Sequence, residues 1–351
     1  MRRCFLQIQK WCDWQIRYNE IIKISKIRIR SVDADMNLLE TLKKQGGTKL
    51  VWQYWQSGVL FFAVCELLLL GKDVKALEIL RLSVQYKIKR KLEKRYRNKI
   101  NEFEKLYDEK NSHMQCEKVW VCWFQGMENA PDIVQKCYAS LKDNLTDREI
   151  ILITTKNMSQ YVEFPDYIIE KWNAGQISHT HMTDLLRLEL LTTYGGMWLD
   201  ATVLCTSRRE EIPEYYFDSE LFLYQTLKPG RDGQAILMSS WLISAKSHNK
   251  ILEMTKYLCY EYWKTNTKLL DYFLMHVFLS IALEHNPAEW SHIIPKDNAT
   301  PHILLLRLFD KYDEQIWNAI KAQNCFHKLT YKFDMEKTKI KGTYYDVLLR
   351  G

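Results

Sequence analysis

The stretch Ser178-His-Thr-His-Met-Thr-Asp-Leu-Leu-Arg-Leu-Glu-Leu-Leu-Thr-Thr-Tyr-Gly-Gly-Met-Trp-Leu-Asp-Ala-Thr-Val203 decides the fold. In its first part apolar residues recur at helical spacing, which predicts a helix over residues 180–194 with one buried face. Asp184 and Arg187 are one turn apart on the less apolar side of this helix, so their side chains can meet at a common ligand. The alternative for this pair is an ordinary surface ion pair.

A glycine pair and a short strand follow this helix. Gly195 and Gly196 are expected to end the helix, because glycine accepts the left-handed conformation common at helix C-termini. The apolar run 197–199 suits a buried strand, and Asp200 stands where that strand ends. In open α/β sheets the carboxyl ends of strands line the ligand cleft, which favours a functional Asp200 over one that caps a turn.

A second α/β signal lies upstream of this stretch. The apolar runs 118–126 and 149–155 predict two strands, and Pro131 marks the start of a helix between them. Strand, helix and strand at this spacing form a βαβ unit in a parallel sheet. We therefore predict an α/β domain over residues 118–335, followed by a C-terminal tail over residues 336–351.

Composition and charge limit the class of protein. The chain has 351 residues of 47% hydrophobic composition, which is enough to bury a sizeable core. Nine cysteines are scattered without C-x-x-C pairs, and the first 30 residues lack the apolar segment of a signal peptide, so we expect reduced thiols in a cytosol and no zinc site. The formal net charge is +7, and residues 1–110 carry 24 Lys and Arg against 13 Asp and Glu. This basic front predicts an anionic partner.

Residues 1–110 are predicted to form a mostly helical, basic N-terminal region. Residues 1–30 have the spacing of an amphipathic helix, either interfacial or packed on its own domain. The most apolar run, 59–70, contains Glu66 and is shorter than the about 20 residues of a bilayer span, so it predicts a buried or interfacial helix. The basic stretch 86–99 suits an anionic membrane, where each basic residue contributes about 1 kcal/mol, or a solvated linker helix.

The motif Thr183-Asp-Leu-Leu-Arg187, followed by Tyr194-Gly-Gly-Met-Trp-Leu-Asp-Ala-Thr202, resembles the signature of bacterial capsular polysaccharide synthesis glycosyltransferases. That family is related to the D-x-D sugar transferases, which have a GT-A fold, a Rossmann-like nucleotide-diphospho-sugar transferase domain. The resemblance covers residues 118–332 and implies a glycosyltransferase. A hexose as the transferred sugar and retention of anomeric configuration are the corresponding expectations.

The resemblance also implies a set of site residues. The expected catalytic residues are Asp200, Asp184, Arg187 and Asp271, the last of them on an apolar helix over residues 269–279. The expected donor-binding residues are Trp123, Gln125, Gly126, Asp184, Arg187, Gly195, Gly196, Asp200, Ser240 and Lys328. From the residues alone, simple packing explains Trp123 and Gln125 equally well, and structural hydrogen bonding explains Asp271 equally well.

A divalent metal, Mn²⁺ or Mg²⁺, is the cofactor that the D-x-D relatives imply. The expected ligands are Asp200, Thr202 and His327. Thr202 stands where D-x-D proteins have their second carboxylate, and a threonine is a weaker, neutral ligand, which weakens the expectation of metal dependence. His179 and His181 do not share a helix face, so they make a poor metal pair.

Our interpretation is a glycosyltransferase that moves a sugar from a nucleotide-sugar donor onto a growing capsular or other cell-surface polysaccharide. The expected acceptor is a glycan or a lipid-linked oligosaccharide, and the expected location is cytoplasmic, peripheral on the inner face of the cell membrane. The alternatives are a nucleotidyltransferase of sugar metabolism and a non-catalytic basic protein that binds membrane or nucleic acid. The acidic segment 125–129 argues against a phosphate loop, and the lack of a basic, aromatic-interleaved β-surface argues against nucleic acid.

Overall fold

Strand β1 (Lys118–Cys122) lies inside a five-stranded sheet with the order β2-β1-β3-β6-β5 in the computed structural model. It pairs in parallel with β2 (Glu149–Ile153) and with β3 (Gly196–Leu199). On the other side of β3, strand β6 (Met238–Ala245) runs antiparallel to β3 and to β5 (Leu221–Gln225). Helix α6 (Asp132–Asn144) connects β1 to β2, so the predicted βαβ unit is confirmed.

The structure describes residues 48–71, 73–107, 114–227 and 235–350. Residues 51–351 form one compact unit. The remaining helices, beyond those named elsewhere in this section, are α9 (Tyr215–Asp218), α12 (Pro287–His292), α13 (Ile303–Leu306), α14 (Glu314–Lys321) and α15 (Tyr344–Leu349). Short 3₁₀ turns occupy Met127–Asn129, Met158–Gln160, Arg209–Glu211, Thr300–His302 and Met335–Lys339.

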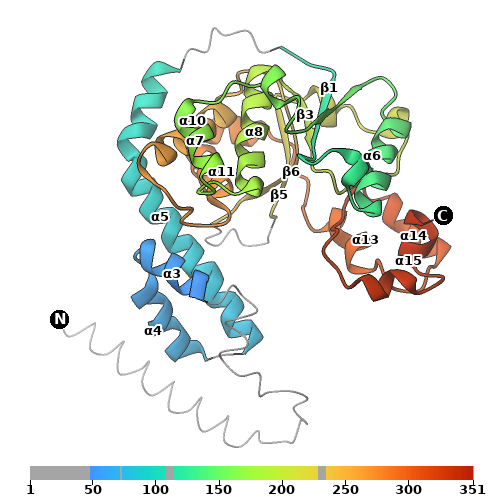
Figure 1. Cartoon of the computed structure of the whole chain (residues 1–351), viewed down its shortest axis with the longest axis horizontal. Coiled ribbons are helices and arrows are strands. Elements are labelled where there is room, and N and C mark those ends of the chain that lie inside the picture. The colour runs from blue at the N-terminus through green and yellow to red at the C-terminus, as the bar shows by residue number, and fades with distance from the viewer. Residues whose placement is uncertain (1–47, 72, 108–113, 228–234, 351) are drawn as a thin grey trace, which may run out of the picture. The chain divides into compact units, whose positions relative to one another are not determined.

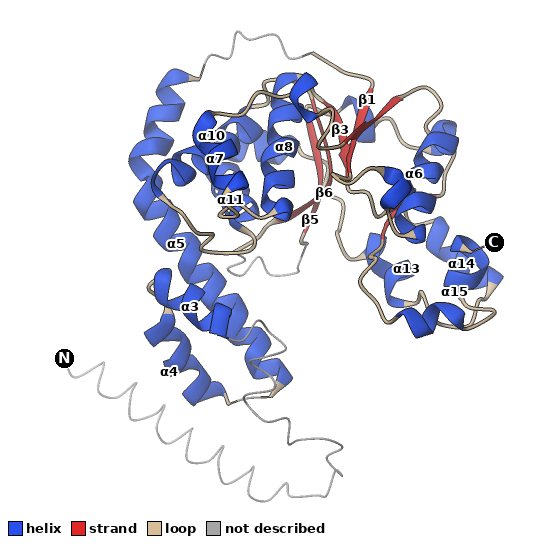
Figure 2. Ribbon diagram, viewed as in Figure 1, coloured by secondary structure: helices blue, strands red, loops and turns tan. Residues whose placement is uncertain are grey.

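Two hydrophobic cores lie on opposite faces of the sheet, because neighbouring side chains on a strand point to opposite faces. Trp120 belongs to one core, whereas Val119 and Val121 belong to the other. Figure 2 shows helices on both sides of the strands, with α6 and the C-terminal helices on the second face. The first face is covered by α5 (Val74–Leu106), α7 (Asp166–Asn173), α8 (His179–Thr193), α10 (Lys250–Thr265) and α11 (Leu274–His285) (Figure 1).

Helix α8 leads directly into β3, as the sequence predicts. The helix ends at Thr193, and the next residue but one, Gly195, has a φ of 73°. Gly196 has a φ of 90° and opens β3. The two glycines therefore turn the chain sharply from a buried helix into the middle of the sheet.

A second, two-stranded sheet pairs β4 (Val203–Cys205) with β7 (Phe326–Lys328) in antiparallel register. Val203 lies opposite Lys328. This pairing brings a segment near the end of the chain beside the residues that follow β3. The placement matters because it delivers Lys328 to the neighbourhood of Asp200.

The part of the N-terminal region that the structure describes is helical: α3 (Thr48–Gln56), α4 (Leu60–Leu70) and α5 (Val74–Leu106). Ile88, Leu92 and Tyr96 form a buried stripe on α5, which packs against α10 and α11. The predicted α/β class with a mostly helical N-terminal region is confirmed. The first 30 residues lie outside the described residues, and the boundaries at 110, 118 and 335 stay predictions.

Helix α4 differs from the buried alternative that its composition allows. Ala63 is the only buried residue within the helix. Phe61, Leu68 and Leu69 are 83%, 79% and 85% exposed. None of the helices in the described part of the chain has both the length and the apolar character of a bilayer span.

Candidate functional site

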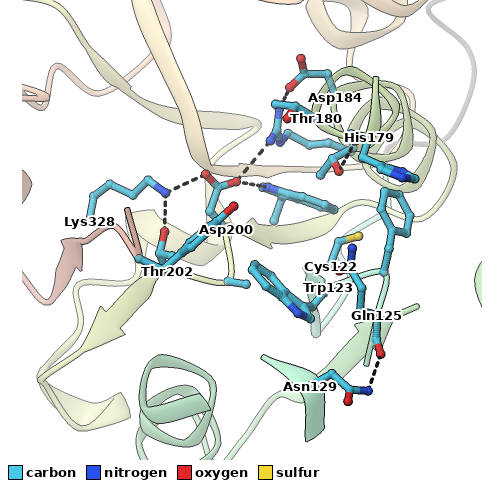
Figure 3. Close-up of a pocket in the computed structure, with 16 residues that line it drawn as sticks. Cys122, Trp123, Gln125, Asn129, His179, Thr180, Asp184, Asp200, Thr202 and Lys328 are labelled. Carbon is cyan, nitrogen blue, oxygen red and sulfur yellow. Dashed lines mark hydrogen bonds and ion pairs between the residues drawn. The ribbon is translucent and has the colours of Figure 1, made fainter. Parts of the chain in front are cut away.

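A cavity of about 340 Å³ opens where β1 and β3 end. Because the two strands are parallel, their carboxyl ends lie at the same edge of the sheet, which is where α/β proteins bind ligands. The cavity is lined by Cys122, Trp123, Phe124, Gln125, Asn129, His179, Thr180, Thr183, Asp184, Arg187, Trp198, Asp200, Ala201, Thr202, Lys328 and Tyr331. Figure 3 shows these side chains converging from β1, α8, β3 and β7.

Asp200 stands at the centre of this site. Its backbone N–H donates to the carbonyl of Trp241 at 2.8 Å, which fixes the residue against β6. Its Oδ1 accepts hydrogen bonds from Arg187 Nη2 at 3.2 Å and from Trp198 Nε1 at 3.0 Å. Its Oδ2 accepts from Lys328 Nζ at 2.9 Å. The carboxylate is therefore held by three donors while its side chain stays 28% exposed toward the cavity.

Arg187 links Asp200 to helix α8. Its Nη1 donates to Asp184 Oδ1 at 2.7 Å, and its guanidinium lies 4.8 Å from the centre of the Trp198 ring. Only 4% of the Arg187 side chain is exposed. A planar, buried guanidinium held between two carboxylates has little freedom to move, so it orients whatever the carboxylates bind.

His181 supports Asp184 from the side away from the cavity. Trp263 Nε1 donates to His181 Nε2 at 2.9 Å, so the neutral ring carries its proton on Nδ1. Nδ1 lies 3.4 Å from Asp184 Oδ2. A continuous chain of side chains thus runs from helix α10 to the cavity.

The electrostatics of the site keep both carboxylates ionised. Burial raises the pKa of Asp184, but the contact with His181 and the charge of Arg187 outweigh it and lower the pKa to about 2. Burial also raises the pKa of Asp200, yet Lys328 and Arg187 together hold it below its ordinary value. The two negative charges of Asp184 and Asp200 are balanced by the two positive charges of Arg187 and Lys328.

Lys328 reaches Thr202 as well as Asp200, as Figure 3 shows. Its Nζ lies 2.6 Å from Thr202 Oγ1. His327, the preceding residue on β7, points to the other face of the strand, where its Nε2 lies 3.0 Å from Thr206 Oγ1 and its ring packs on Trp317. The structure therefore brings Lys328 into the site and keeps His327 out of it.

The donor set at Asp200 bears on the expected divalent metal. No group of three His, Cys, Asp or Glu in the described residues is arranged to hold a metal ion. Both oxygens of Asp200 already accept from cationic side chains, and Thr202 faces an ammonium group. Hard divalent cations prefer several anionic or neutral oxygens, and a lysine at that place opposes them. These residues do not fit a metal that the protein alone would hold.

Aromatic side chains form another part of the cavity wall. The rings of Trp123 and Tyr331 meet edge to face at 5.4 Å between centroids. Phe124, Trp172 and His179 form a second cluster, with ring centroids 5.5–5.8 Å apart. Planar, apolar surfaces beside polar groups suit a ring-containing ligand.

Gln125 lies beside this aromatic wall, and its backbone carbonyl accepts from Asn129 Nδ2 at 3.1 Å. Asn129, Thr180 and Tyr331 line the cavity although the sequence did not single them out as site residues. Asn129 and Tyr331 each follow a predicted site residue by three or four positions, Gln125 and Lys328. Closeness in sequence to Gln125 and Lys328 is the feature from which these two residues could have been predicted.

Several predicted site residues lie outside the cavity lining. Gly126 forms the turn after Gln125, with its N–H bonded to the carbonyl of Trp123. Gly195 and Gly196 pack against backbone of neighbouring segments rather than facing the cavity. Ser240 is buried on β6, where its Oγ lies 2.9 Å from His276 Nε2.

Asp271 is also placed away from the cavity. The expectation that it lies on an apolar helix is wrong, because α11 begins at Leu274. Its Oδ1 instead accepts from the backbone N–H of Phe273 at 2.7 Å in the turn that precedes the helix. Burial raises the pKa of this carboxyl. Residues 271–273, Asp-Tyr-Phe, therefore form a turn, although their spacing also fits the helical pattern of the residues that follow.

The fold and the site together define an α/β protein with a charged cleft at the carboxyl ends of parallel strands. The sequence model of the family described as "Capsular polysaccharide synthesis protein" matches residues 72–348. The chain belongs to this family, as the motif around Asp200 predicts.

Three curated proteins show partial similarity to the chain. "O-glycosyltransferase braB" of Annulohypoxylon truncatum is 28% identical over 153 residues, covering 39% of this chain and 35% of that protein. "O-glycosyltransferase PaGT" of Phomopsis amygdali is 24% identical over 146 residues, covering 37% and 35%. "Glycosyltransferase afumC" of Aspergillus fumigatus is 33% identical over 95 residues, covering 24% of each. The matches span about a third of the length of the first two relatives.

One solved structure, "PaToxG Glycosyltransferase", covers 58% of this chain and 80% of its own at 14% identity. Its TM-score is 0.35, which is too low to equate the two folds.

Proposed function

We propose that this protein is a glycosyltransferase that moves a sugar, expected to be a hexose, from a nucleotide-diphospho-sugar onto a growing capsular or other cell-surface polysaccharide. The family membership supports the reaction class, and the family description supports the polysaccharide. A lipid-linked oligosaccharide is the acceptor that fits such a chain-building reaction. The parallel β2-β1-β3 unit with its cleft at the strand ends supports a GT-A fold.

One observation carries the proposal: Asp200 faces the cavity with Arg187 and Lys328 bound to its two oxygens. A carboxylate accepts hydrogen bonds from ribose or sugar hydroxyl groups. Lys328 supplies positive charge next to it, where a diphosphate would lie. The aromatic wall of Trp123 and Tyr331 offers a surface for a base or a sugar ring.

Glycosyl transfer breaks the bond between the anomeric carbon and the diphosphate oxygen, and the electron pair stays on that oxygen. The acceptor hydroxyl oxygen forms the new bond to the anomeric carbon and loses its proton. Negative charge therefore accumulates on the leaving diphosphate in the transition state. A fixed ammonium such as Lys328 stabilises that charge most when it is already in place before the reaction.

The cavity supports retention of the anomeric configuration, because inversion needs a free general base beside the acceptor hydroxyl. The carboxylates of the described lining residues, Asp184 and Asp200, are paired with cations and have lowered pKa values, which makes both weak bases. Trp172 Nε1 donates to His179 Nδ1 at 3.3 Å, so the neutral ring of His179 carries its proton on the other nitrogen. The departing diphosphate oxygen is then the available acceptor of the proton.

A thermal-shift panel of nucleotide sugars and nucleoside diphosphates tests the proposal, since a ligand that binds only the folded protein raises its melting temperature. At least one nucleotide sugar should stabilise the wild-type protein and serve as a donor for transfer. Asp200→Asn should abolish that stabilisation and reduce transfer by at least about 100-fold, which corresponds to roughly 2.7 kcal/mol. Asp310→Asn, at an exposed carboxylate outside the cavity lining, is the matched control. Undiminished turnover of Asp200→Asn would contradict the proposal.

A further inference from the structure

Helix α4 presents an apolar surface that no described element covers. Phe62 and Glu66 face α5: the Phe62 ring receives Lys87 Nζ at 4.0 Å, and Glu66 accepts from Ser83 Oγ at 2.9 Å. By helical spacing, Phe61 and Leu68 lie on the opposite side, where both are largely exposed. Val64 is exposed as well, and Leu69 and Leu70 are exposed at the C-terminal end of the helix, so exposed hydrocarbon extends along α4. Such patches on a protein surface mark a binding site.

Helix α5 carries an exposed apolar stripe of its own, and its chemistry changes along the helix. Ile79, Leu82 and Tyr86 are exposed and recur every three or four residues, so they share one face of the helix. The same spacing leads on to Arg90 and Arg97. One face of α5 therefore passes from apolar to basic within a few turns.

The basic end of this face is a hollow lined by five cations. Lys87, Arg90, Lys91, Lys94 and Arg97 surround it together with Glu93. Two of these lysines also touch the α3–α4 segment: Lys87 lies over Phe62, and Lys91 Nζ donates to the carbonyls of Ser57 and Gly58 at 3.0 and 2.5 Å. The cationic hollow therefore lies next to the α3–α4 segment, and we call the hollow together with the exposed apolar side chains of α4 the α4–α5 face.

We propose that the α4–α5 face docks on a bilayer surface that carries anionic lipid headgroups. The exposed side chains of α4 would enter the boundary between headgroups and acyl chains, and the cations of α5 would contact the phosphates. Trp52 and Trp55 on the neighbouring helix α3 are exposed, as is common for aromatic side chains at a membrane interface. At eleven residues, α4 is long enough to lie in the interface plane and too short to cross it.

Charge complementarity favours lipid over the other occupants of an apolar face. A symmetric contact with a second copy would bring the same patch together and oppose five cations with five cations. Residues 1–47 carry 10 Lys and Arg against 5 Asp and Glu, so they are themselves basic and do not complement the hollow. An anionic membrane satisfies the apolar and the cationic parts of the face at once.

Flotation of the full chain with vesicles tests this docking. The protein should float with vesicles of phosphatidylcholine and phosphatidylglycerol, bind pure phosphatidylcholine much more weakly, and lose affinity as salt rises. The triple change Phe61→Ser, Leu68→Ser and Leu69→Ser, and separately Arg90→Glu, Lys94→Glu and Arg97→Glu, should each lower the partition coefficient by at least about tenfold. These side chains are exposed, so the melting temperature should not change.

Matched controls lie elsewhere on the surface. Leu306→Ser, Met335→Ser and Ile340→Ser replace apolar residues that are also exposed, at 79%, 64% and 51%. Lys337→Glu, Lys339→Glu and Lys341→Glu reverse the charge of three other cations. Both control sets should bind anionic vesicles as the wild-type protein does. Equal binding to neutral and anionic vesicles, or no binding to either, would overturn the proposal. It would equally be overturned if light scattering showed a dimer that the Phe61, Leu68 and Leu69 changes dissociate.

Discussion

The ammonium group of Lys328 lies 2.9 Å from the carboxylate of Asp200, although the two residues are 128 positions apart in the chain. The antiparallel pairing of β4 with β7 makes this contact, and Thr202 completes it by accepting a hydrogen bond from the same ammonium group. A cation therefore stands beside the carboxylate where the D-x-D relatives are expected to hold a metal ion. In the proposed reaction, the positive charge beside the leaving diphosphate can therefore come from Lys328 rather than from a metal ion.

We expect nucleoside diphosphate binding that does not require added metal. EDTA should leave the affinity of the wild-type protein within about twofold, measured by calorimetry with the nucleotide that gives the largest thermal shift. Lys328→Ala should lower that affinity by about tenfold or more, because one charge-assisted contact is lost.

The double change Thr202→Asp with Lys328→Ala should convert the site into one that binds a divalent metal ion. It restores a second carboxylate and removes the opposing cation, so Mn²⁺ titrated alone should bind the double variant and not Lys328→Ala. A wild-type protein whose nucleotide affinity disappears in EDTA would refute this view of Lys328.

His181 is expected to act as a positioning residue for Arg187 through Asp184. His181→Phe keeps the volume of the ring but removes its contact with Asp184, so the free energy of unfolding should fall by roughly 1.5–3 kcal/mol. Donor affinity should fall as well, because Arg187 is less firmly held. Urea unfolding and calorimetry measure the two effects. Trp263→Phe removes the N–H that fixes the His181 tautomer and should produce a smaller change in the same direction.

The local part of the site could be predicted from the sequence. Asp184, Arg187 and Asp200 are brought together by a helix, a glycine turn and a strand that follow one another, and each of these has a short-range pattern. The position of Lys328 has no such pattern, because it depends on pairing between strands far apart in the chain. Only the resemblance to a family pointed to it.

Two misplacements, of His327 and Asp271, and one alternative that the sequence left open, at the run 59–70, have equally physical reasons. His327 and Lys328 are neighbours, and only the pairing of β7 decides which of them faces the site. Apart from Glu66, the run 59–70 is apolar on all sides, so its composition fits a buried helix and an exposed one alike. The turn at Asp271 was hidden because its apolar neighbours fit a helical period.

Falling pH should destabilise the protein through two buried histidines. Burial lowers the pKa of His276 and of His327 to about 4, whereas an unfolded histidine titrates near 6.5. The unfolded chain therefore takes up these protons first, and the stabilising contribution, complete above pH 6.5, is lost as the pH falls toward 4. Linkage sets a ceiling of about 3 kcal/mol for each histidine.

Urea midpoints measured between pH 7 and pH 4.5 check this dependence. His327→Gln keeps a hydrogen-bonding side chain beside Thr206 but cannot titrate, so its stability should fall less steeply with pH. His292→Gln, at an exposed position, should follow the wild-type curve. Stability that is constant from pH 7 to pH 4.5 would contradict the assignment of buried, neutral histidines.

Gly196 should prove structural rather than a donor ligand. An alanine there would press its Cβ into the backbone carbonyl of Lys118 on β1, at a φ of 90° that alanine rarely adopts. Gly196→Ala should lower the free energy of unfolding by roughly 2–4 kcal/mol, with urea unfolding as the measurement. Gly342→Ala is the matched control, because Gly342 has a φ of 71° with no atom near its would-be Cβ, and it should cost only about 1 kcal/mol. If Gly196→Ala were as stable as the wild type and lost only nucleotide affinity, the glycine would belong to the donor site after all.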